Sequence, residues 1–226
     1  MHFLRCVLAE WALVRPRLSR TRYGICLLFL GAALVWLGHA RGGADALTIA
    51  LHAGALAAVL GVAFAAGSSA DRAALAIALA HPTTPLALAC GRWLAAVLPA
   101  AGLTLVCTTL VGWETGAAVA GLAAAGAVAG FALAAVLGAG SGAAVVLFIC
   151  TALAGAVPPE TIVGVAEPGA ARLAIASALE LGPALWRYRQ VAGGGDQLGA
   201  ALHAVAWAVL GVLLASVLVR HRGRVA

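Results

Sequence analysis

The sequence contains no lysine, because all fourteen of its basic residues are arginine. A P-loop nucleotide site needs the lysine of its GxxxxGK[ST] motif to contact phosphate, and a Ser-Lys protease needs a lysine as its base. Neither kind of site can be built from this chain alone.

Charged residues are also scarce, at 10% of a chain that is 64% hydrophobic. Several windows are almost free of charge over roughly 20 residues, the length of helix that crosses the hydrocarbon core of a bilayer. These windows predict an all-α integral membrane protein that lies in the lipid bilayer.

The formal net charge of +6 does not indicate nucleic-acid binding. The arginines cluster beside the apolar windows, where anionic lipid headgroups neutralise them. We therefore expect the lipid bilayer as a partner and no nucleic acid.

Cysteine is present at five scattered positions, with no CxxC pair and no Cys/His spacing of a metal site. Small apolar packing residues are the expected role for such cysteines. We expect no metal and no cofactor in this chain.

The apolar windows predict six spans, which divide the chain into an N-terminal helix over residues 1–22 and a transmembrane domain over 23–226. The six spans cover residues 23–40, 46–67, 88–111, 117–137, 143–158 and 198–219. Pro99 lies inside the third span and predicts a kink, because proline removes one backbone hydrogen bond.

Residues 2–15 carry the helical pattern of the predicted N-terminal helix, and Pro16 follows them. Its apolar side chains recur at helical spacing, whereas Arg5, Glu10 and Arg15 fall elsewhere. The apolar set is Phe3, Leu4, Val7, Leu8, Trp11 and Val14. This pattern is typical of an amphipathic helix that lies in the membrane interface.

The arginines also predict the orientation of the chain, since they concentrate on the cytoplasmic side of membrane proteins. With both termini in the cytoplasm, ten arginines lie inside and four lie outside. The outer four are Arg41, Arg172, Arg187 and Arg189. We expect a multi-pass protein of the inner (plasma) membrane.

Residues 159–196 then form a long outer segment. Apolar and polar residues alternate in it at nearly helical spacing, with a break at Gly182–Pro183. This pattern predicts short helices at the outer leaflet, with Trp186 and Tyr188 at headgroup depth.

A polar stretch over residues 70–81 interrupts the apolar windows on the cytoplasmic side. Asp71 lies where the dipole of a short helix favours negative charge, and the helix must stop near His81 because Pro82 follows. The sequence predicts a short, rigid cytoplasmic helix between two spans, which could transmit movement from a cytoplasmic partner.

This layout resembles the membrane subunit of ABC-2-type transporters. The local similarity lies in "SSADRAALAIALAHPTTPLALACGRWLAA" and in the closing segment from "LGPALWRYRQ" onward. The resemblance implies that the helix at about 70–81 is a coupling helix that docks on a P-loop ATP-binding subunit. The residues expected at this contact are Asp71, Arg72, Leu75, Leu79 and His81.

The resemblance further implies a pair of membrane subunits, identical or related, with ATP and Mg²⁺ bound in the partner ATPase rather than in this chain. We therefore expect an exporter permease without enzymatic activity of its own, moving an apolar or amphipathic substrate. A membrane subunit like that of the cytochrome c maturation exporter is a second reading. A third is a non-transporting membrane anchor or haem-bearing subunit, in which His52 and His203 could ligate the haem.

Overall fold

The computed structural model describes residues 2–20, 22–41, 46–66, 83–112, 115–140, 142, 146, 149, 169–180, 182–192 and 196–225. Within these ranges every regular element is a helix. Five of the helices are long and apolar enough to cross a membrane. The all-α class is therefore confirmed, and the described chain is compatible with a multi-pass membrane protein. Most of the predicted fifth span, 143–158, lies outside the described residues.

The five long helices follow the predicted spans closely. They are α2 (Tyr23–Arg41), α3 (Ala46–Ala66), α5 (Pro85–Val111), α6 (Thr115–Ala139) and α11 (Gln197–Val225). The end of α11 lies six residues after the predicted residue 219, and the start of α5 lies three residues before the predicted residue 88. The helix begins there because the Thr84 hydroxyl oxygen accepts a hydrogen bond from the Ala87 N–H at 3.2 Å, and Pro85 follows at the first helical position.

Helix α5 continues through Pro99 as one helix. Because proline has no N–H, the carbonyl of Ala95 lacks its usual partner four residues on. Helix α5 ends at Gly112, which has a φ of 72° and a left-handed conformation.

Helices α6 and α11 run in the same direction along their contact. A Cβ on Gly116 would meet Ala192, just before α11, whereas Gly130 lies against Ala208 and Gly138 faces Leu218. The span predicted over residues 143–158 lies between these two helices in the sequence.

Small residues bring the central helices into close contact. A Cβ added to Gly54 of α3 would lie 2.5 Å from the carbonyl oxygen of Gly121 in α6. Gly211 of α11 approaches the backbone of Gly130 in α6 in the same manner. Close backbone approach through small residues is the usual packing mode of helices in lipid, where the hydrophobic effect does not drive helix association.

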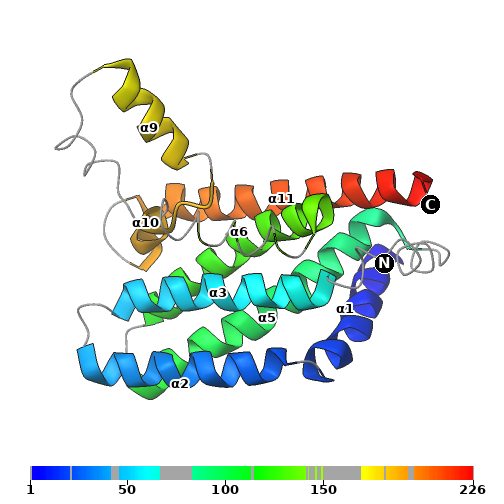
Figure 1. The fold of residues 1–226 in the computed structure, drawn as a ribbon. Helices are drawn as coiled ribbons and strands as arrows, with labels where there is room; N and C mark the ends of the chain where they lie inside the picture. The colour runs from blue at the N-terminus through cyan, green and yellow to red at the C-terminus, as the bar shows by residue number, and fades with distance from the viewer. Residues whose placement is uncertain are drawn as a thin grey trace.

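Helix α1 (His2–Arg20) lies across one end of this bundle, as Figure 1 shows, near the C-terminus of the chain. The helix continues through Pro16 to Arg20, within the predicted range of residues 1–22. Packing on both sides of the proline accompanies this continuity. Val14 and Leu18 are buried together against Tyr23, Ala65 and Ala95, and this contact outweighs the lost backbone hydrogen bond.

The predicted outer segment contains helices α9 (Ala170–Glu180) and α10 (Leu185–Tyr188) and the 3-10 turn η3 (Arg189–Ala192). Two short helices separated at Gly182–Pro183 match the prediction. The segment lies at the end of the bundle opposite α1 (Figure 1). The Tyr188 ring is fully buried in the protein.

Candidate functional site at the junction of the N-terminal helix and the bundle

The predicted contact residues for a partner, Asp71, Arg72, Leu75, Leu79 and His81, lie outside the described residues. The two ends that hold their segment are described. Helix α3 ends at Ala66 and α5 begins at Pro85 at the same end of the bundle, and α1 crosses this end (Figure 1). The junction of α1 with α5 therefore lies at the end of the bundle where α3 ends and α5 begins.

A buried ion pair joins α1 to α5 at this junction. The Arg92 Nε–H donates a hydrogen bond to Glu10 Oε1 at 3.0 Å, and the two side chains are only 5% and 10% exposed. The neighbouring Gly91 makes the approach possible, since a Cβ there would lie 2.7 Å from the Cβ of Glu10. Helix α1 is thus fixed to the first part of α5 by charge and by close backbone contact.

The ion pair is incompletely satisfied. Among the described residues the buried Arg92 Nη1 has no hydrogen-bond partner. A buried pair of this kind is weak evidence for net stability, but removing one partner leaves a buried charge uncompensated. The position of α1 therefore depends on both Glu10 and Arg92 being present and charged.

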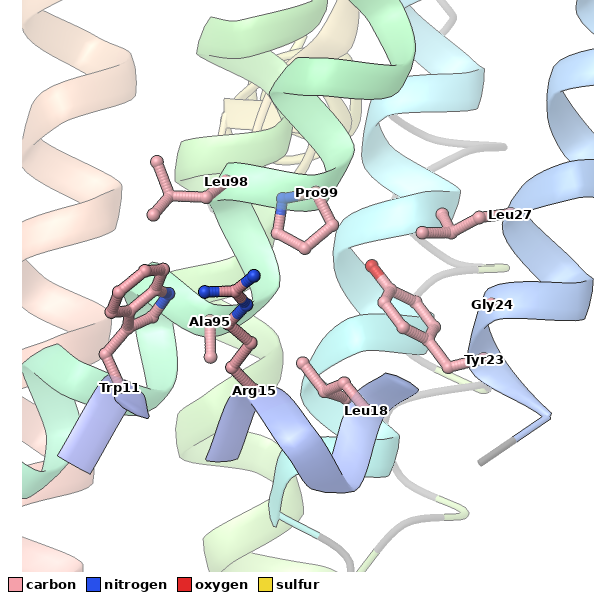
Figure 2. Close-up of a pocket in the computed structure, with 9 residues that line it drawn as sticks. All are labelled: Trp11, Arg15, Leu18, Tyr23, Gly24, Leu27, Ala95, Leu98 and Pro99. Carbon is pink, nitrogen blue, oxygen red and sulfur yellow. The ribbon is translucent and has the colours of Figure 1, made fainter. Parts of the chain in front are cut away.

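An apolar crevice opens beside this junction, where α1, α2 and α5 meet (Figure 2). Its volume is about 250 Å³. Nine residues line it, three from each helix: Trp11, Arg15, Leu18, Tyr23, Gly24, Leu27, Ala95, Leu98 and Pro99. Among these described lining residues there is no acid and one cation.

That cation is the exposed Arg15, whose guanidinium lies 5.7 Å from the centre of the Trp11 ring. Figure 2 shows Arg15 rising from α1 between Trp11 and Tyr23. In the part of the chain that the structure describes, Arg15 forms no ion pair, and Glu10 of the same helix is paired with Arg92. Stacking on an aromatic ring leaves the in-plane N–H donors of an arginine available for an anion.

The two histidines considered as haem ligands are differently placed. The Trp207 Nε1–H donates to His203 Nε2 at 3.1 Å, so that Nε2 is the acceptor and the proton lies on Nδ1, 3.2 Å from the Tyr188 hydroxyl oxygen. Both ring nitrogens of His203 are thus engaged. His52 Nδ1 lies 2.8 Å from the Thr48 carbonyl oxygen. His203 in this arrangement does not fit the role of an iron ligand.

A second apolar groove of about 400 Å³ lies between α5, α6 and α11. Trp93 borders it and donates its indole N–H to the Gly126 carbonyl oxygen at 3.0 Å. Aliphatic side chains form the rest of its wall, among them Val119, Leu122 and Val209. The groove has the apolar character expected of a surface that contacts lipid or an apolar molecule.

Sequence reasoning placed Glu10 off the apolar face of the first helix and did not pair it with Arg92. A signal was present, since Glu10 lies three residues after Val7 and four before Val14, both of which are buried. An acid on the buried face of a helix predicts a basic partner.

No protein-family model, no curated protein and no solved structure matches the chain.

Proposed function

We propose that this chain is the membrane-spanning permease subunit of an ABC-type exporter, with both termini in the cytoplasm. In this proposal ATP and Mg²⁺ are bound by a separate P-loop subunit, which docks on the segment at about 70–81. A second membrane subunit completes the complex. The substrate is apolar or amphipathic, in keeping with the aliphatic walls of the groove between α5, α6 and α11.

The observation that carries this proposal is the buried ion pair between α1 and the first part of α5, the helix that follows the predicted docking segment in the sequence. That segment connects α3 to α5, and α5 begins within a few residues of it at a capped, proline-initiated turn. Two turns further on, Arg92 binds Glu10 of α1. A displacement at the docking segment would reach α5 first and α1 through the buried ion pair. A rigid connection of this kind suits the transmission of movement from a cytoplasmic partner.

The absence of lysine supports a division of labour between chains, because a P-loop cannot be formed here. The direction of the long helices supports an even number of crossings. Both ends of the chain lie at the same end of the bundle in Figure 1, as a protein with two cytoplasmic termini requires.

The test is gentle purification of the tagged protein from its native membrane, followed by mass spectrometry of the associated chains. We expect an ATP-binding subunit with a P-loop in about equal amount. The double variant Asp71→Ala, Arg72→Ala should lose this subunit and still insert in the membrane. Its matched control, Arg172→Ala with Glu180→Ala in α9, also removes one base and one acid but at the other end of the bundle, and should retain the subunit.

Unchanged recovery of the ATPase with the Asp71/Arg72 variant would remove the docking segment from the proposal. A preparation without any ATPase, and with haem absorbance or a large respiratory assembly instead, would favour the anchor-subunit reading.

A further inference from the structure

We propose that the crevice between α1, α2 and α5 binds one acyl chain of an anionic phospholipid, whose phosphate is held by Arg15. This inference concerns the α1 junction itself and does not depend on an ATPase partner. It follows from the lining, the charge and the position of the crevice.

The lining fits a hydrocarbon chain. Leu18, Leu27, Leu98 and Pro99 contribute apolar side chains, and the Tyr23 hydroxyl is turned away to donate to the Ala57 carbonyl oxygen at 3.2 Å. The volume of about 250 Å³ is below the ~300–1,000 Å³ of pockets that enclose a whole small molecule. The crevice is therefore suited to part of a molecule that remains in the membrane.

The charge fits an anion. Arg15 is the single charged residue among the described residues of the lining, and it is exposed beside the apolar wall. Helix α1 also carries the exposed Arg5, whereas Glu10 of the same helix is buried against Arg92. The accessible charge on this part of α1 is positive, and arginines beside a membrane surface attract anionic headgroups.

The position of the crevice fits both the acyl chain and the headgroup of a lipid. Helix α1 crosses the end of the bundle, and Tyr23 is the first residue of the first long apolar helix. Trp11 and Tyr23 on either side of Arg15 are the aromatic types enriched at the boundary of headgroups and acyl chains (Figure 2). A chain in the crevice thus leaves its phosphate at the level of Arg15.

Two pairs of matched variants test the site. Arg15→Gln removes its charge, and Arg5→Gln removes another exposed charge of α1 outside the crevice. Gly24→Leu fills the crevice, because a Cβ at Gly24 meets nothing within 4 Å and so causes no clash. Gly102→Leu is its control, since a Cβ at Gly102 of α5 also meets nothing within 4 Å and Gly102 does not line the crevice.

The full-length protein and each variant are reconstituted in an equimolar mixture of phosphatidylglycerol and phosphatidylcholine. They are then extracted gently, and the retained lipids are counted by native mass spectrometry. Wild type, Arg5→Gln and Gly102→Leu should retain one phosphatidylglycerol in preference to phosphatidylcholine. Arg15→Gln should lower that preference roughly fivefold, the effect expected of one arginine at an anionic surface. Gly24→Leu should lose the retained lipid of both kinds.

Retention by Gly24→Leu equal to wild type would show that the crevice is not the binding place. Equal headgroup preference in Arg15→Gln and wild type would overturn the assignment of the phosphate to Arg15. Should Gly24→Leu elute as an aggregate, the comparison of Arg15→Gln with Arg5→Gln decides the inference alone. Loss of the preference in both arginine variants would indicate diffuse attraction to α1 and would also overturn it.

Discussion

Glu10 and Arg92 lie 82 positions apart in the sequence and are joined by a 3.0 Å hydrogen-bonded ion pair in the structure. The pair connects a helix that crosses the end of the bundle to a helix that runs along it. The two side chains are almost completely buried, so each charge is compensated by the other.

The first prediction concerns this pair. Glu10→Ala should destabilise the attachment of α1 by about 3–5 kcal/mol, because it leaves the Arg92 charge buried without its partner. Arg92→Ala should have a comparable effect. Replacing both residues by leucine should be much less harmful than either single change. Protease access to the end of α1 and thermal unfolding in detergent measure these effects.

Arg5→Ala is the control for the ion pair, because Arg5 lies on the exposed side of the same helix. If the two single variants and Arg5→Ala unfold alike, the buried pair does not hold α1.

The second prediction concerns the close contact of α3 and α6. Gly54→Leu should prevent folding of the bundle, because even a Cβ at Gly54 would lie 2.5 Å from the Gly121 carbonyl oxygen. Gly102→Leu introduces the same side chain where nothing lies within 4 Å of the Cβ and should fold normally. Size-exclusion chromatography of the solubilised proteins distinguishes the two outcomes. A monodisperse Gly54→Leu protein would contradict the packing described for these helices.

The third prediction concerns the start of α5. Thr84→Ala removes the side-chain oxygen that accepts from the Ala87 N–H and should cost about 1 kcal/mol of stability, whereas Thr84→Ser should keep the cap. Thr109→Ala is a control at the other end of the same helix, where the exposed hydroxyl bonds to the Val106 carbonyl oxygen. The measurement is amide hydrogen exchange over the first turn of α5. Faster exchange confined to Thr84→Ala supports the cap, and equal exchange in both alanine variants contradicts it.

The five long apolar helices were predictable because each contains a long apolar run, and the bounds of α2, α3 and α6 need little more than that. The packing of α1 was not predictable, because it depends on contacts of Val14 and Leu18 with residues distant in the sequence. A local sequence pattern does not include such contacts.

The candidate site was predictable only in part. The charges of the predicted docking segment are visible in the sequence, but the segment lies outside the described residues. The crevice could not be predicted, since it arises where three helices meet, and Arg15 appears in the sequence as one basic residue among several. For His52 and His203 the sequence alone allowed a haem-ligand role, which the hydrogen bonds of His203 to Trp207 and Tyr188 do not favour.

The distance in sequence between Glu10 and Arg92 also sets an order of events during synthesis. Helix α1 leaves the ribosome well before α5 exists, and at about 5–20 residues per second the 82 intervening positions take roughly 4–16 s. During that interval Glu10 has no partner and must remain hydrated at the membrane surface. The N-terminal helix can therefore reach its final place only after α5 has been synthesised, which makes its docking a late step in the assembly of the protein.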